Sequence, residues 1–210
     1  LAIFHKGDPD ARVRFELALA LGGTKAEICI LPLAELAVRD GANRWTRAAV
    51  LSGAKETGGT VLASLLSLAK DVALTGPERA GLSTLMADLG QMLASSEPAA
   101  KLSSHLQPAL DSNRPDATEW QSAFATGLGN GARAKGLGKD GRSALVTLAS
   151  ANPDTARRLG ELFAAASKTV TTASAPTPER LAAIDLLAHS DAATAGAALQ
   201  SLIAPQTPNE

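Results

Sequence analysis

Apolar side chains recur at helical spacing along most of this chain of 210 residues. In the stretch 8–22, for example, Val13, Leu17, Ala20 and Leu21 fall on one helical face. Strand-like runs of Val, Ile, Thr and aromatic residues are nearly absent. The pattern therefore predicts an all-α protein of about ten helices in antiparallel pairs. We place them at 8–22, 26–38, 44–51, 61–72, 77–93, 98–110, 116–128, 142–149 and 154–170, then from 177, and from the turn at 190–191 to about 203.

Proline at the first turn marks several of these helix starts, because its missing N–H group has no hydrogen bond to lose there. Asp8-Pro9 opens the first helix in this way, and the glycines at 22–23 predict its end, because glycine adopts the left-handed conformation without steric cost. Pro32 instead lies inside the second helical pattern, so it should kink that helix or shift its start. The prolines at helix starts are Pro9, Pro98, Pro153 and Pro178.

Similar sequences recur at an offset of 33 residues, seen when Val13-Arg14 is placed over Thr46-Arg47. This offset is a plausible length for a repeat of two helices. Each hairpin would have two apolar faces and would not bury both alone, so neighbouring hairpins would stack. We expect one α-solenoid of antiparallel helix hairpins over residues 1–210. A closed helical bundle is the alternative, and it would explain the helices but not the offset.

The first helix carries a recognisable motif, formed by Asp8-Pro9, Val13-Arg14, Ala18, Ala20 and Leu21-Gly22. This motif resembles the first helix of a HEAT-like repeat, of the short type found in bilin-lyase-related proteins. Residues 44–51 and 178–187 resemble the helical stretch of large bacterial secreted multidomain proteins. In that family a propeller-like dehydrogenase-type domain precedes HEAT-like repeats, and a haem-binding cytochrome c-type domain follows them.

The resemblance implies a non-catalytic repeat scaffold that mediates protein–protein or inter-domain contacts within a larger, possibly redox, protein. Such a protein would be extracytoplasmic, in the periplasm or secreted. The haem attachment pattern Cys-x-x-Cys-His is absent here, so a redox role would lie outside this segment. Two alternatives remain: a helper segment of a haem-containing dehydrogenase-type enzyme, and an enzyme similar to bilin lyases. Because the chain starts at Leu1 and ends in a loop-like stretch, we expect a segment of a longer protein.

The composition argues against several kinds of binding partner and site. Hydrophobic residues make up 45% of the chain and charged residues 20%, and the net charge is −1, so no general attraction to nucleic acid or anionic membranes is expected. No uninterrupted apolar run approaches the roughly 20 residues that span a bilayer, so membrane insertion is not expected. A single cysteine excludes an internal disulfide framework and a cysteine-cluster metal site.

The stretch 127–141 holds six glycines and three cations in fifteen residues. We interpret it as a flexible insertion between helices. A nucleotide site is disfavoured, because a dinucleotide fingerprint needs a preceding strand and Lys139 is followed by Asp140 rather than Ser or Thr. We therefore expect no cofactor in this segment.

Side chains typical of catalysis and metal binding are scattered. His5, His105 and His189 lack a second ligand at zinc-binding spacing, and each is expected to be a solvated or capping side chain near a helix end. Cys29 has apolar neighbours and is expected to act as a small buried hydrophobe. The sequence therefore indicates no catalytic residue and no metal site.

Arg14 and Arg47 occupy equivalent positions in the repeat. One interpretation is a structural ladder, in which each guanidinium pairs with Asp8, Asp10 or Asp40 and with turn carbonyls. The other is a basic stripe for an anionic partner. We favour the ladder, because the carboxylates lie in the preceding turns.

The remaining candidates are residues for binding a protein partner. Trp45 and Trp120 both lie at starts of first helices, and each either covers the seam between hairpins or is exposed to a partner. We favour the seam. The second helix of each hairpin would line a concave face, where Lys25, Glu35 and Arg39 are candidate contacts with a protein or with flanking domains of the same chain.

Overall fold

The structure, a computed structural model, describes residues 8–24, 26–71, 74–111, 117–138 and 141–203. Within these ranges it contains eleven α-helices, one 3-10 helix and no strand, which confirms the all-α prediction. The elements are α2 (Ala11–Thr24), η1 (Glu27–Cys29), α3 (Ile30–Asp40), α4 (Arg44–Gly53), α5 (Gly58–Asp71), α6 (Gly76–Ser96), α7 (Ala99–Leu110), α8 (Ala117–Ala134), α9 (Ala144–Ala149), α10 (Pro153–Thr171), α11 (Thr177–Leu187) and α12 (Ala192–Leu202).

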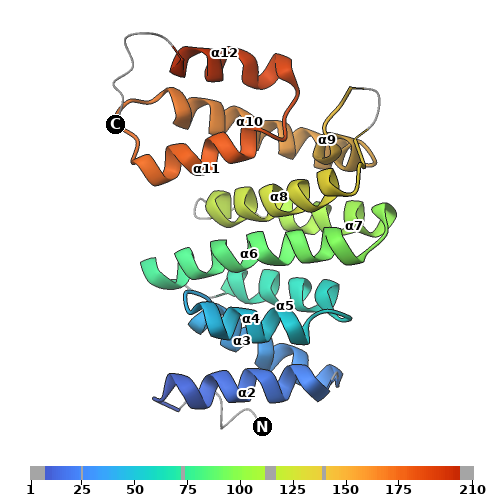
Figure 1. Cartoon of the computed structure of the whole chain (residues 1–210), viewed down its shortest axis with the longest axis vertical. Coiled ribbons are helices and arrows are strands. Elements are labelled where there is room, and N and C mark those ends of the chain that lie inside the picture. Colours follow the sequence, from blue (N-terminus) through green and yellow to red (C-terminus); the bar gives the residue numbers. More distant parts are fainter. Residues whose placement is uncertain (1–7, 25, 72–73, 112–116, 139–140, 204–210) are drawn as a thin grey trace.

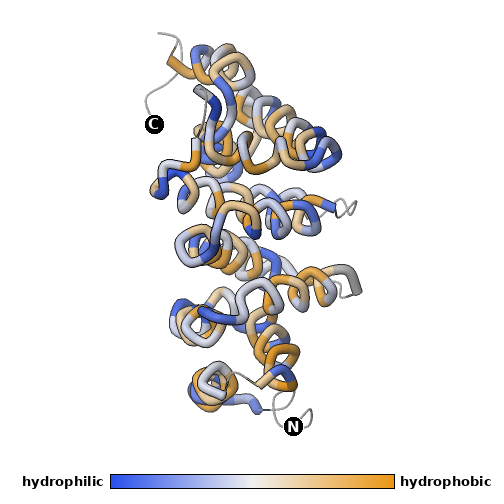
Figure 2. Tube along the Cα trace, turned by 90° about the vertical axis from the view of Figure 1, so that its right-hand side faces the viewer, coloured by the Kyte–Doolittle hydropathy of each residue, from blue (hydrophilic) through white to orange (hydrophobic). Residues whose placement is uncertain are grey.

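The helices follow one another along the long axis of the molecule, with α2 at one end and α12 at the other (Figure 1). Two rows can be traced through their contacts. In the first row α2, α4, α6, α8 and α11 contact each other in succession. In the second row α3, α5, α7, α10 and α12 do the same, and the short α9 packs against α7, α8 and α10. Figure 2, turned by 90°, shows the same elongated arrangement from the side.

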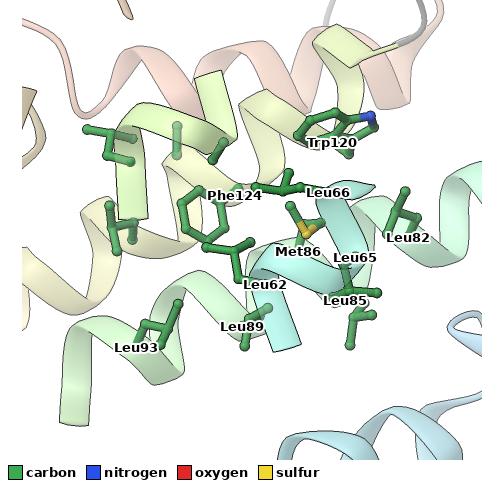
Figure 3. Close-up of a cluster of buried hydrophobic side chains, with 14 of the residues drawn as sticks. Leu62, Leu65, Leu66, Leu82, Leu85, Met86, Leu89, Leu93, Trp120 and Phe124 are labelled. Atoms are coloured by element: carbon green, nitrogen blue, oxygen red, sulfur yellow. The ribbon is translucent and has the colours of Figure 1, made fainter. Parts of the chain in front are cut away.

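One cluster of buried hydrophobic side chains extends through the stack, from Ala18 in α2 to Ala195 in α12. In its middle, leucines of α5 meet α6 and the aromatic residues of α8 (Figure 3). The apolar residues of α6 are buried at helical spacing, as their sequence pattern predicts. They are Leu82, Leu85, Met86, Leu89 and Leu93.

The start of α10 shows the predicted combination of a capping side chain and a proline in the first turn. Asn152 caps α10, with its side-chain oxygen accepting hydrogen bonds from the N–H groups of Asp154 and Thr155 at 2.9 and 3.2 Å, and Pro153 takes the first helical position. Pro32 shifts its helix rather than kinking it, since η1 precedes α3 and leaves the proline in the first turn of α3. There its missing N–H group costs no helical hydrogen bond.

The apolar face predicted for the first helix is right for Leu21 and for the partly buried Leu17, but wrong for its other two residues. Val13 and Ala20 are exposed, whereas Arg14, Ala18 and Gly22 are buried together with Leu21. Small residues take the packed face because α4 comes very close to α2. A Cβ atom added to Gly22 would lie 2.6 Å from the Cα of Gly53 in α4. The helix ends at Thr24, one residue after the predicted stop at 22–23, but Gly22 lies within α2 and serves its packing against α4.

The flexible insertion predicted at 127–141 is likewise wrong for its first half, because α8 continues to Ala134. Gly127 is buried in that helix, where a Cβ atom would lie 1.9 Å from the carbonyl oxygen of Ala87 in α6. From the other side, a Cβ atom on Gly90 would lie 2.6 Å from the carbonyl oxygen of Phe124. Glycine is required here because the backbones of α6 and α8 touch. Lys139 and Asp140 lie outside the described residues.

Replacement of Gly127 tests this contact. Gly127→Ala should lower the free energy of unfolding by about 1–3 kcal/mol, because the added methyl group must separate α6 from α8. Gly160→Ala in α10 is the matched control, since Gly160 is exposed and has open space around its Cα. The control should gain up to about 1 kcal/mol from helix propensity. Urea unfolding followed by circular dichroism measures both, and equal effects would contradict the close contact.

Candidate functional site

Arg14 links three parts of the N-terminal helix pair. Its Nε and Nη2 donate hydrogen bonds to the two carboxylate oxygens of Asp40, at the end of α3, at 2.6 and 2.8 Å. Its Nη1 donates to the carbonyl oxygens of Asp8 and Pro9, at 2.9 and 3.0 Å. The side chains of Arg14 and Asp40 are only 10% and 13% exposed. The hydrogen bond with Asp40 raises the pKa of Arg14, so the guanidinium stays charged.

Arg47 repeats this arrangement one helix pair later. Its Nη1 donates to the carbonyl oxygen of Gly41 at 2.8 Å, six residues earlier, as Arg14 does to Asp8. Its Nε donates to a carboxylate oxygen of Asp88 in α6 at 2.7 Å. This pair is more open, with 17% and 42% of the two side chains exposed. Each arginine is the fourth residue of its helix.

The structure therefore places the predicted ladder residues in different roles. Asp40 pairs with Arg14, but the carboxylates of Asp8 and Asp10 accept hydrogen bonds from backbone N–H groups two residues later. Asp88, the partner of Arg47, was not predicted, because it lies 41 residues along the chain. Both guanidinium groups are directed into the stack and occupied by acceptors. This arrangement favours the structural ladder over the basic stripe.

A further signal in the sequence was missed. Pro-Glu-Arg occurs at 77–79 and again at 178–180, and it makes Arg79 and Arg180 the fourth residues of α6 and α11. Both are half-buried, and Arg79 donates through Nη2 to the carbonyl oxygen of Leu74 at 3.4 Å. The fourth-position arginine is thus a recurring feature of first-row helices.

The prediction that the histidines are solvated or capping side chains is wrong for the two that the structure describes. His105 lies inside α7, where its Nε2 is 2.7 Å from Oε2 of Glu97 and its ring covers Gly59. His189 is buried, with 2% of its surface exposed. His5 lies outside the described residues.

Cys29 is buried, as predicted, beside a cavity of about 10 Å³ that is also lined by Leu21 and Gly53. A cavity of this size holds about one water molecule. In the described part of the chain, no group of three or more His, Cys, Asp or Glu side chains is arranged to hold a metal ion.

The two tryptophans, similar in sequence context, differ in environment. Trp120 is 4% exposed and packs in the core near Leu66 (Figure 3), as the seam interpretation predicts. Trp45 is 61% exposed, so the seam interpretation is wrong for it. The guanidinium carbon of Arg44 lies 4.6 Å from the centroid of the Trp45 ring, in a cation–π arrangement. Trp45 is therefore available to a partner.

The candidate partner-binding residues of α3, in the second row, are less available to a partner than Trp45. Glu35 is half-buried and Arg39 is exposed, and both already have interactions within the chain. The pKa of Glu78 is lowered mainly by hydrogen bonds from Thr75, and Arg39 adds to this effect through its charge. Lys25 lies outside the described residues.

Large exposed apolar side chains gather at the two ends of the stack. Four belong to the first helix pair, and we call them the N-terminal end face: Val13, Leu19, Ile28 and Leu31. At the other end, Leu181 of α11 and Ile203 after α12 are exposed. Between the ends, Trp45 is the one further large hydrophobic residue that is exposed among those that the structure describes.

Comparison of the chain with protein-family models, with curated proteins and with solved structures finds no match. Across the described ranges, no helix combines the length and apolar character needed to cross a membrane.

The arginines are expected to differ in their contribution to stability. Arg14→Ala should lower the free energy of unfolding by about 3–5 kcal/mol, because it leaves the carboxylate of Asp40 buried without its partner. Arg47→Ala should cost less, about 1–2 kcal/mol, since water reaches Asp88. Arg12→Ala is the control, because Arg12 is 94% exposed, and it should change stability by less than about 0.5 kcal/mol. Denaturant midpoints at neutral pH and moderate salt measure all three, and a loss for Arg14→Ala no larger than that of the control would refute the ladder.

Proposed function

We propose that this chain is a HEAT-like α-solenoid that acts as a non-catalytic scaffold and holds a protein partner or flanking domains of the same polypeptide. The observation that carries the proposal is the distribution of exposed apolar side chains. They lie on the first and last helix pairs and at Trp45, not evenly over the surface.

The repeat interpretation is supported by equivalent contacts in successive helix pairs. Arg14 in α2 and Arg47 in α4 donate to backbone carbonyl oxygens at the same sequence distance. α2 and α4 also run in the same direction, because the C-terminal end of α2 meets that of α4 at Gly22 and Gly53. Both properties are expected of a solenoid, in which each unit contacts mainly its neighbours.

The ends of such a stack are where a partner would bind. Among the described residues, the inner helix pairs have neighbours on both faces, whereas the first and last pairs have a neighbour on one face. Exposed apolar side chains that are clustered rather than scattered are typical of interaction sites. The N-terminal end face, with Ile28 and Leu31 three residues apart and both exposed, therefore suits an apolar protein surface such as another amphipathic helix.

Trp45 provides a second type of contact. Tryptophan and arginine are enriched among the residues that dominate binding energy at protein interfaces. The ring of Trp45 is open to solvent on α4, and Arg44 already lies over it. A protein partner fits these features better than a nucleic acid, because the net charge is −1 and the guanidinium groups of Arg14 and Arg47 are already occupied.

Site-specific photocrosslinking in the cells that naturally produce this protein would test the scaffold. A photoreactive amino acid placed at position 31 or 45 should give a covalent adduct of defined mass, with another protein or with another part of the same polypeptide. Position 160 in α10 is the matched control, because Gly160 is exposed and a Cβ atom added there would meet no atom within 4 Å. Adducts at 31 and 45 no stronger than at 160 would argue against the proposal.

Trp45→Ala separates binding from folding. Because the side chain is mostly exposed, its loss should change the free energy of unfolding by less than about 1 kcal/mol. It should weaken binding of the crosslinked partner by roughly 2 kcal/mol or more, the usual effect of removing a dominant interface tryptophan. Trp120→Ala should do the opposite and cost about 3–5 kcal/mol of stability, as removal of a buried aromatic side chain does. Titration calorimetry and denaturant unfolding on both variants measure the contrast.

A further inference from the structure

His189 is a buried titratable group at the joint between the last helix pair and the rest of the stack. It follows the C-terminal end of α11, and 2% of its surface is exposed. Its ring lies directly on α8, where a Cβ atom added to Gly129 would come within 2.8 Å of both Cγ and Nδ1 of the imidazole. The absence of a side chain at Gly129 is therefore what makes room for the ring.

The backbone of the same residue is held by a different element. Ser143 caps α9, with its side-chain oxygen accepting a hydrogen bond from the N–H group of Val146 at 3.1 Å. The hydroxyl of Ser143 in turn donates to the carbonyl oxygen of His189. The turn after α11 is thus fixed to α8 by packing and to α9 by a hydrogen bond.

The charges that act on the imidazole come from two of these elements. Burial is the main effect that lowers the pKa of His189 below its ordinary value of 6.5, and the positive charge of Arg133 in α8 lowers it further. Asp185 in α11 acts in the opposite direction and raises the pKa. On the α9 side the contact is the hydroxyl of Ser143, which does not titrate in this range. At neutral pH the docked ring is consequently neutral.

We propose that His189 is an acid-sensitive latch, whose protonation loosens the docking of the C-terminal end of α11 on α8 and on Ser143 at the start of α9. An imidazolium in this position would have to lose most of its hydration against the backbone of α8, under the influence of a second cation, Arg133. When α11 moves away, the same ring is hydrated and carries its proton without this cost.

The sign of the effect follows from linkage. The docked state has the lower pKa, so the undocked state binds more protons once the pH falls below about 6.5. The latch is fully effective above that pH and weakens below it. The equilibrium constant for undocking should rise by up to about tenfold for each pH unit below 6.5, until the docked pKa is reached.

Hydrogen exchange measured by mass spectrometry would test the latch on the full chain. Protection factors, corrected for the intrinsic pH dependence of exchange, should fall by up to about tenfold for α11 amides between about pH 7.5 and pH 5.5. Those of α5 should change little, because α5 lies outside this joint. His189→Gln should abolish the fall, whereas His105→Gln should leave it unchanged. A fall that is equal in α5 and α11, or that survives in His189→Gln, would overturn the proposal.

Two surface variants keep the test decisive if His189→Gln does not fold. Arg133→Gln removes a charge that lowers the pKa of His189, so it should reduce the acid-induced loss of protection. Asp185→Asn removes the charge that raises this pKa, so it should increase the loss. Both side chains are exposed, so neither change should disturb folding. Effects of the same sign in the two variants, or no effect in either, would show that His189 does not control docking.

Discussion

The contact between the backbones of α6 and α8 determines how the two halves of this stack meet. Gly90 and Gly127 let the helices approach until a single added carbon atom would collide with a carbonyl oxygen. Close-packed interiors tolerate such additions poorly, because neighbouring atoms cannot move aside without opening gaps elsewhere. The large side chains of α6 and α8, such as Leu89 and Phe124, consequently lie beside this contact rather than within it, and there they meet α5 (Figure 3).

The arginines stabilise a different part of the structure, the turns that precede their own helices. Arg14 and Arg47 each satisfy carbonyl groups just before their own helix and also reach an acidic side chain from another element. A buried ion pair gains little stability over an apolar contact, but an unmatched one is costly. These pairs are therefore suited to fixing the relative positions of elements that the leucine-rich core would allow to slide.

The sequence was sufficient for the helices and for the stripe of α6, because periodicity is a local property. It was misleading at Gly127, where a glycine-rich composition indicates a loop unless another helix lies against it. Trp45 and Trp120 show the same limit, since both begin first-row helices but only Trp120 has neighbours that cover it. Asp88 and His189 could not be predicted as partners of Arg47 and Gly129, because these contacts join elements far apart in the sequence.

The different environments of the two tryptophans also have an optical consequence. The chain contains two tryptophans and no tyrosine, so its near-ultraviolet emission comes almost entirely from one indole in the core and one in water. A soluble quencher such as iodide would reach the ring of Trp45 while sparing that of Trp120. The emission of the protein can therefore be divided into one part that reports the surface of α4 and another that reports the interior of the stack.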